Sequence, residues 1–337
     1  MTRTLARFLP LTAALLVMTV AAAIGAEPCS HRGKLDVLYC DEDRDQIADP
    51  PKDKSKLVSP NPLIFTYAPV EDPAVYEGAW SDFLKHLEKV TGKKTKYFGL
   101  QNYAAQIEAM RSGRLHISAF STGSVVYAVN LAGGVPFAIM RDAKGPSGYH
   151  LIVITQAKND KIKTIADLKG KRVAHVSQTS SSGHQAPIYF FSRMGVTPGK
   201  DYQIVFSGKH DASALGVVNG DYDAAAVADT VLERMVARGV VKAGDYKVIY
   251  TSPVFPTAGF LYPHNLEPKL VEKIKDAFAS FKLEGTSLGK EFKGRTGFLP
   301  LNYQKDWESI VGILEANGVT FTKDSPEYRR LEKRGSE

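Results

Sequence analysis

The sequence lacks the short motifs that mark most nucleotide-dependent and metal-dependent enzymes. It contains no Gly-x-Gly-x-x-Gly, no Walker loop, no His-Glu-x-x-His and no paired Cys-x-x-Cys. Dinucleotide, triphosphate and zinc chemistry therefore have no support in the sequence. The eight histidines are scattered, and nothing marks a serine or cysteine as a nucleophile. We expect a protein that is not an enzyme and has no catalytic cofactor.

Cysteine is scarce, because Cys29 and Cys40 are the only two in the chain. One close pair in a chain bound for an oxidising compartment is typical of a single disulfide. A lipid anchor on Cys29 is the alternative, but Glu27 and Pro28 separate that cysteine from the small residues that would precede the cut. We therefore predict a disulfide between Cys29 and Cys40.

Long apolar runs are absent after the N-terminus. Arg3 and Arg7 precede residues 8–24, which carry no charge and are followed by small residues. This pattern is typical of a secretory signal peptide, so residues 1–26 are predicted to be cleaved off. A membrane anchor is the alternative, but the run contains Pro10 and is barely long enough to span a bilayer. We expect a periplasmic protein.

The charge of the chain is mildly basic. Removal of the two signal-peptide arginines lowers the formal charge from +7 to +5, because residues 1–26 contain no acidic residue. No run of lysine and arginine with interleaved aromatics occurs, which argues against a nucleic-acid partner. A small anionic solute suits an exported basic protein better. We expect a monomer that binds such a solute and no nucleic acid.

Residues 27–61 are polar, rich in Asp, Lys and Pro, and without apolar periodicity, so they are predicted to form an irregular N-terminal extension. Four of its acidic residues have a spacing that can bring several carboxylates onto one calcium ion. These are Asp41, Asp43, Asp45 and Asp49. A solvated acidic turn is the alternative, because Arg44 interrupts the loop and the usual glycine and bidentate Glu are missing.

From residue 62 onward, short β-rich runs alternate with helical patterns. Strands are expected at 63–67, 95–98, 116–120, 135–140, 149–155, 172–176, 202–206 and 224–228, with helices between most of them and a mainly helical tail after 268. Such alternation predicts an α/β fold with parallel sheets and ligand sites at the carboxyl ends of strands. We expect one domain from residues 62–150 and 256–337 and a second from 151–255, joined as a hinged clamshell by two extended crossovers.

Three strands end in small polar residues immediately before a helix. The three segments are residues 121–124 (Ser-Thr-Gly-Ser), 178–183 (Gln-Thr-Ser-Ser-Ser-Gly) and 207–211 (Ser-Gly-Lys-His-Asp). Helix N-termini carry unpaired N–H groups and the positive end of the helix dipole, so they bind anions. Ordinary capping is the alternative for each segment. Four consecutive hydroxyls at residues 179–182 exceed what one cap requires, which favours ligand contact.

These segments resemble those of the phosphonate- and phosphite-binding proteins of ABC importers. Residues 179–183 are similar to the family's Ser-Thr-Ser-Gly loop, and residues 208–215 (Gly-Lys-His-Asp-Ala-Ser-Ala-Leu) to its Gly-His-Glu segment. Residues 103–111 resemble its Tyr-Ala-x-x-Ile-x-x-Met-Arg helix. The resemblance covers most of residues 62–317 and implies a type II periplasmic binding protein.

The resemblance also implies a set of ligand contacts. Phosphoryl oxygens would be held by the hydroxyls of the 179–182 segment, by His210 and by Tyr103. Phe120 stands where aminophosphonate binders have a second contacting tyrosine, so Ser121 or Thr122 would take over that contact. The segment comprises Thr179, Ser180, Ser181 and Ser182.

Where aminophosphonate binders hold an ammonium group with two carboxylates, this chain has Thr230, with Asp229 beside it, and Ala258. We therefore expect a ligand without an amine, such as phosphite, hypophosphite or a small alkylphosphonate, delivered to an ABC permease in the inner membrane. A periplasmic sensor that presents its ligand to a histidine kinase is the alternative function, and an enzyme on a similar scaffold a third.

Overall fold

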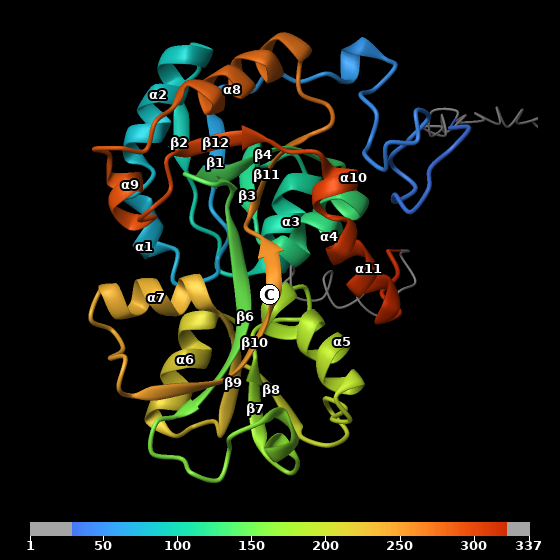
Figure 1. Cartoon of the computed structure of the whole chain (residues 1–337). Coiled ribbons are helices and arrows are strands. Elements are labelled where there is room, and N and C mark those ends of the chain that lie inside the picture. The colour runs from blue at the N-terminus through green and yellow to red at the C-terminus, as the bar shows by residue number, and fades with distance from the viewer. Residues whose placement is uncertain (1–28, 322–337) are drawn as a thin grey trace, which may run out of the picture.

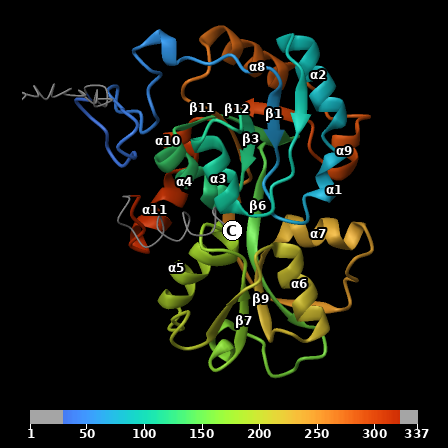
Figure 2. The same cartoon turned by 180° about the vertical axis from the view of Figure 1, so that it is seen from behind.

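A computed structural model describes residues 29–321, arranged as two lobes (Figures 1 and 2). The first lobe is built on a seven-stranded sheet of order β12-β4-β11-β3-β1-β2, with β5 paired to β4. Its strands are β1 (Leu63–Thr66), β2 (Thr95–Tyr97), β3 (Ile117–Phe120), β4 (Gly134–Asp142), β5 (Gly145–Pro146), β11 (Gly259–Pro263) and β12 (Gly297–Pro300). Its helices are α1 (Ala74–Glu77), α2 (Ser81–Thr91), α3 (Tyr103–Arg111), α4 (Thr122–Ala132), α8 (Pro268–Ser280), α9 (Ser287–Glu291), α10 (Tyr303–Asp306) and α11 (Glu308–Ala316).

The second lobe is built on a five-stranded sheet of order β10-β6-β9-β7-β8. Its strands are β6 (Gly148–Gln156), β7 (Arg172–His175), β8 (Gln203–Phe206), β9 (Ala224–Ala228) and β10 (Tyr246–Pro256). Its helical elements are η2 (Ile165–Leu168), η3 (Ser181–Gln185), α5 (Ala186–Arg193), α6 (His210–Asn219) and α7 (Asp229–Ala237). The paired strands β6 and β10 connect the two lobes (Figure 1). From these two sheets we propose that the first domain comprises residues 62–150 and 256–337 and the second residues 151–255, as expected from the sequence.

The helical periodicity after β1 correctly marks core side chains. Tyr76, Trp80, Phe83 and Leu87 are all fully buried, and they share their cluster with the aromatic residues of α8 and β12. The segment forms two helices rather than one, because α1 ends at Glu77 and α2 begins at Ser81. The ring of Phe83 packs 4.7 Å from that of Phe278 on α8. This apolar packing holds α2 and α8 against the first sheet.

One expectation about the sheets is wrong. Both sheets are mixed rather than parallel: β1 is parallel to β2 and β3, but β11 runs antiparallel to β3 and β4, and β10 antiparallel to β6. Strand β6 leads the chain from the first lobe into the second, and β10 leads it back, so these two strands run in opposite directions. Strand β11 then continues into the first sheet, where it is antiparallel to β3 and β4. The tail after 268 is mainly helical as expected, and it also contains strand β12, whose four residues pair with β4 at the sheet edge and are too short to show a periodicity.

The N-terminal extension is irregular as expected, apart from the single turn η1 (Lys54–Lys56). The predicted disulfide is confirmed, because Cys29 and Cys40 are bonded with 5.6 Å between their Cα atoms. The extension packs on the first lobe, where Asp36 donates its N–H to the carbonyl oxygen of Asn130 at 2.8 Å. The predicted signal peptide lies outside the described residues. Between residues 29 and 321, none of the helices combines the length and the apolar character needed to cross a membrane.

Candidate functional site

A cavity of about 410 Å³ lies between the two lobes. Its volume falls in the range of small-molecule sites. The first lobe contributes Tyr67, Val70, Ser121, Thr122, Met140 and Phe260 to its wall, and the second contributes Tyr149, Ser180, Ser181, His210, Thr230 and Glu233. The wall therefore combines hydroxyl groups with an apolar side.

Four helical segments begin at this cavity, and each contributes residues to its wall. Helix α4 begins after Ser121, η3 after Ser180, α6 after Lys209 and α7 after Ala228. The N-cap residues of α4, α6 and α7 make no side-chain capping hydrogen bond. Because helix N-termini and their dipoles favour negative charge, this convergence is suited to an anion.

The hydroxyls of the 179–182 segment have different partners. Ser180 Oγ accepts the N–H of Gly183 at 3.1 Å and so caps η3. Thr179 Oγ1 accepts a hydrogen bond from Ser124 Oγ at 3.2 Å, and Ser124 Oγ in turn accepts one from Ser121 at 2.9 Å. Ser181 Oγ is buried and has no hydrogen-bond partner within residues 29–321. Capping therefore explains Ser180, whereas Ser181 keeps a donor for a ligand.

Tyr149 on β6 lies beside this segment, although the sequence analysis did not identify it. Burial raises the pKa of its phenol, and the nearby hydroxyls of Ser182, Thr122 and Ser181 partly offset that rise. The Tyr103 hydroxyl is also buried and lacks a hydrogen-bond partner in the described part of the chain. Burial also raises the pKa of Tyr103, and the charge of Tyr149 raises it further. Both phenols are therefore protonated donors at neutral pH.

His210 is a neutral hydrogen-bond donor in this cavity. Its Nδ1 accepts the N–H of Ala228 at 3.1 Å, which leaves the ring proton on Nε2. Burial, with a smaller effect from the charge of Arg234, lowers the pKa of His210 to about 3. The imidazole is therefore uncharged in any physiological compartment, and it can donate to an anion without adding a charge of its own.

The predicted site residues separate into two groups. Ser121, Thr122, Ser180, Ser181 and His210 line the cavity together. The others are not among the residues that line it. They are Tyr103, Phe120, Thr179, Ser182 and Asp229.

Two members of the second group have clear structural partners. Phe120 is fully buried in the core at the end of β3. Asp229 accepts the N–H of Thr230 at 2.6 Å, and the N–H of His150 also donates to it. Its carboxylate therefore accepts backbone N–H groups of both α7 and β6.

The wall near the positions of an aminophosphonate's ammonium partners is mostly neutral. Thr230, Thr257 and Ala258 line it, and Thr257 Oγ1 is buried without a partner in the region that the structure describes. Glu233, one turn beyond Asp229 on α7, is a lining carboxylate that the sequence analysis missed. Its side chain is exposed, so it lies toward the outer part of the cavity.

Basic residues lie at the same outer part. Lys290, Lys293 and Arg295 line the cavity, and the two lysines are exposed. Arg295 also pairs with Asp142 at 3.2 Å. Cations at the mouth of a cleft raise the local concentration of anionic ligands. Among the inner lining residues Ser181 and His210 are neutral, and the guanidinium of Arg234 is paired with Glu71 at 2.8 Å.

A buried ion-pair group joins the lobes beside the cavity. Glu71 follows β1 in the first lobe and is 1% exposed. Its Oε1 accepts from Arg234 Nη2 on α7 at 2.8 Å, and Arg238 pairs with its other oxygen. Across the same boundary the backbone N–H of His210 donates to the carbonyl oxygen of Val70 at 3.0 Å. These contacts hold the two lobes together around the cavity.

Comparisons with known proteins agree with this architecture. The sequence matches the family described as "ABC transporter, phosphonate, periplasmic substrate-binding protein" over residues 65–307. The phosphate-import protein PhnD of Mycolicibacterium smegmatis is 30% identical over 254 residues, which cover 71% of this chain and 79% of that protein. The phosphonates-binding periplasmic protein of Escherichia coli is 27% identical over 263 residues, covering 75% and 77%.

A solved structure supports the fold. PhnD1 from Prochlorococcus marinus in complex with methylphosphonate has a TM-score of 0.69 at 21% identity, with 77% of this chain and 99% of that chain covered. The two lobes therefore form the clamshell of type II periplasmic binding proteins, as the sequence predicted. The chain belongs to the phosphonate-binding family of periplasmic substrate-binding proteins of ABC transporters, which are transport proteins and not enzymes.

Proposed function

We propose that this protein binds a small phosphorus oxyanion without an amine, namely phosphite, hypophosphite or a small alkylphosphonate, and delivers it to an inner-membrane permease. The observation that carries the proposal is the buried Ser181 hydroxyl, which lines the cavity and has no partner within the described residues. A buried hydroxyl without a partner costs free energy unless a ligand supplies one. A phosphoryl oxygen is such an acceptor.

The arrangement of donors favours a tetrahedral anion. The starts of α4, η3, α6 and α7 approach the cavity from both lobes, and His210 adds a neutral donor. Hydrogen bonds to a charged acceptor are shorter and stronger than neutral ones, so several such donors can hold an anion without a direct counter-charge. The PhnD1 structure with methylphosphonate supports assigning this chemistry to the same fold.

The cavity also has room for an organic substituent. Met140, Val231, Ala258 and Phe260 form an apolar part of its wall. Burial of a methyl or ethyl group against such a surface is favourable. Among the three ligand types we therefore favour a small alkylphosphonate, with phosphite and hypophosphite as weaker ligands.

An ammonium group would find less support. Thr230 and Ala258 carry no charge, and the carboxylate of Asp229 serves backbone N–H groups. Two carboxylates line the cavity: Glu233, which would compensate an amine from its outer part, and Glu291, which is already paired with Arg238 at 2.6 Å. We expect 2-aminoethylphosphonate to bind at least ten-fold more weakly than methylphosphonate.

Isothermal titration calorimetry of the mature protein tests the ligand class. The panel is methylphosphonate, phosphite, hypophosphite, 2-aminoethylphosphonate, phosphate and sulfate. Tightest binding of methylphosphonate, phosphite or hypophosphite supports the proposal. Preference for 2-aminoethylphosphonate overturns it, and so does preference for phosphate. Phosphate is included because the Mycolicibacterium relative is named a phosphate-import protein.

Uptake of the preferred anion by cells that lack the gene tests delivery to a permease. Loss of uptake supports transport, whereas normal uptake with a lost transcriptional response would instead assign a sensor. We also propose that the protein acts as a monomer without nucleic acid. Light scattering coupled to gel filtration measures its mass, and a stable dimer would contradict the monomer.

A further inference from the structure

Three carboxylates of the N-terminal extension lie together. Asp41, Asp43 and Asp45 each offer one oxygen, and these oxygens lie within 4.8 Å of one another. Arg44 and Gln46 between and after them adopt positive φ angles of 63° and 68°. Non-glycine residues rarely adopt this region. The loop therefore maintains an unfavourable backbone shape that brings like charges together.

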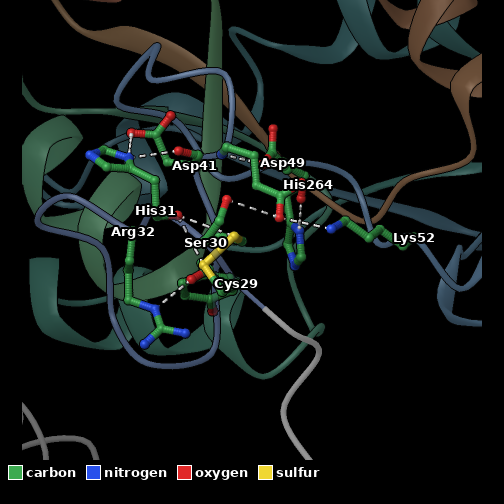
Figure 3. Close-up of a disulfide and its surroundings, with 11 residues drawn as sticks. Cys29, Ser30, His31, Arg32, Asp41, Asp49, Lys52 and His264 are labelled. Carbon is green, nitrogen blue, oxygen red and sulfur yellow. Dashed lines mark hydrogen bonds and ion pairs between the residues drawn. A yellow bond between two sulfur atoms is a disulfide. The ribbon is translucent and has the colours of Figure 1, made fainter.

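Asp41 is buried, and one of its carboxylate oxygens has no partner in the described part of the chain. It is 1% exposed, and its Oδ1 has no hydrogen-bond partner among residues 29–321. Its Oδ2 accepts the N–H of Gln46 at 3.2 Å and lies 3.7 Å from Nδ1 of His31 (Figure 3). Burial of a carboxylate oxygen without a partner is costly. The buried oxygen thus belongs to a group of carboxylates that lacks a sufficient counter-charge.

The net negative charge of the loop also calls for a cation. Residues 41–49 contain five carboxylates and one arginine, although the whole chain carries a formal charge of +7. Asp49 lies outside the group of three, and its Oδ2 accepts the N–H of Glu42 at 2.7 Å. The sequence expectation of four converging carboxylates is thus met by three in the structure.

The loop is tied to the first lobe on both sides. The disulfide ends at Cys40, directly before Asp41. After the loop, the carbonyl oxygen of Asp49 contacts Nδ1 of His264 at 2.8 Å (Figure 3), next to β11. Gln304 on α10 donates to the carbonyl oxygen of Arg44 at 3.3 Å. A cation in this loop would therefore stabilise the docking of the extension.

We propose that Asp41, Asp43 and Asp45 bind a calcium ion that fixes the N-terminal extension on the first lobe. Calcium is a hard cation that takes several oxygen ligands in flexible geometry, whereas magnesium demands near-ideal octahedral geometry and keeps its waters. The loop has no bidentate glutamate, so the site belongs with the weak extracellular class, with a dissociation constant of about 0.1–1 mM. Such a site fills at the millimolar calcium of an external medium.

The test compares the mature, disulfide-bonded protein in EDTA, in 10 mM CaCl₂ and in 10 mM MgCl₂. We expect calcium to raise the melting temperature by a few degrees over EDTA, and magnesium to raise it by less. Calorimetric titration with CaCl₂ should give one site per chain. The double variant Asp43→Asn/Asp45→Asn removes two exposed carboxylates and should abolish both responses.

Asp53→Asn is the matched control. Asp53 is an exposed carboxylate of the same extension, it lies outside the group of three, and asparagine preserves its capping of Ser55. This variant should keep the full calcium response. Both variants should bind methylphosphonate with the affinity of the parent protein, which shows that they are folded.

Three results would overturn the proposal. The first is no heat and no change in melting temperature up to 10 mM CaCl₂. The second is an equal or larger response to magnesium. The third is a calcium response that survives in Asp43→Asn/Asp45→Asn. Because methylphosphonate binding is measured separately, failure of the calcium site leaves the ligand assignment untouched.

Discussion

Gly123 lies so close to Thr179 that a Cβ atom on the glycine would be 2.3 Å from the carbonyl oxygen of the threonine. The same atom would lie 2.9 Å from the backbone nitrogen of Ser181. Gly123 belongs to the first turn of α4 in the first lobe, and the other two residues precede and begin η3 in the second. Two helix starts therefore meet backbone to backbone at the cavity.

Gly123→Ala should weaken ligand binding by forcing the lobes apart. Because the contacting atoms belong to the backbone, no side-chain rotation can make room for the methyl group. We expect affinity for methylphosphonate to fall at least ten-fold in calorimetric titrations, and solution scattering to show a more open molecule. Gly312→Ala is the control, since that glycine lies in α11 with open space around it and alanine favours helix. Equal affinities for all three proteins would refute this reading of the contact.

Ser181→Ala should lower ligand affinity, whereas Ser180→Ala should lower stability. The Ser181 hydroxyl lies in the cavity and has no partner among residues 29–321, so its loss should lower affinity for methylphosphonate ten- to a hundred-fold, or about 1.5–3 kcal/mol, with little change in melting temperature. Ser180 caps η3, so its loss should cost about 1 kcal/mol of stability. Ser181→Asp should abolish binding, because a carboxylate would oppose the anion. Unchanged affinity in Ser181→Asp would eliminate this hydroxyl as a ligand contact.

His210 should make the protein less stable in mild acid. The folded pKa is about 3, below the value near 6.5 of an unfolded histidine, so the unfolded state binds the proton first. Stability is therefore complete above pH 6.5 and declines as the pH falls toward 3. His210→Gln should remove one proton from this dependence, which flattens the slope by up to about 1.4 kcal/mol per pH unit. Urea unfolding of both proteins between pH 7 and 5 measures the difference, and identical slopes would contradict the burial of a neutral imidazole.

Glu71→Gln should destabilise the protein strongly. It removes the carboxylate that lies 2.8 Å from the buried guanidinium of Arg234 and leaves the more distant Glu291, at 3.6 Å, as the partner, and breaking a buried pair from one side costs about 3–5 kcal/mol. Glu315→Gln is the comparison, because Glu315 forms an exposed pair with Lys34 that is expected to contribute about 1 kcal/mol or less. Urea titrations give both free energies of unfolding. A cost for Glu71→Gln no larger than that for Glu315→Gln would show that the pair does not hold the lobes.

The local features of the fold are predictable from the sequence because they depend on neighbouring residues. The aromatic face from Tyr76 to Leu87, the helix that begins at Tyr103 and the strand of small residues at 224–228 all have a clear periodicity or composition. Strand direction depends instead on how the lobes connect, which no local pattern carries. For that reason the mixed pairing of β11 and the edge strand β12 were missed.

The site shows the same division. Ser181 and His210 lie at strand-to-helix junctions that are visible in the sequence. Tyr149 was taken only as part of a strand, and Thr257 lies far from these junctions in the chain, so only the packing of the lobes brings it to the cavity. Glu233 lies one turn after the junction of β9 and α7, where the sequence drew attention only to Asp229 and Thr230. Unpaired hydroxyls, such as that of Thr257, become visible only when every hydrogen bond around them is known.

Trp307 gives the chain an internal optical signal of occupancy. Its indole Nε1 donates to the carbonyl oxygen of Thr122 at 2.8 Å, at the start of α4. Trp80, the other tryptophan in the sequence, is fully buried in the aromatic cluster of the first lobe. An anion bound at the start of α4 would change the electric field at the indole of Trp307 and leave that of Trp80 nearly constant. The intrinsic fluorescence of the unlabelled protein should therefore report ligand arrival in real time, and stopped-flow mixing would give the rate constants of association and release.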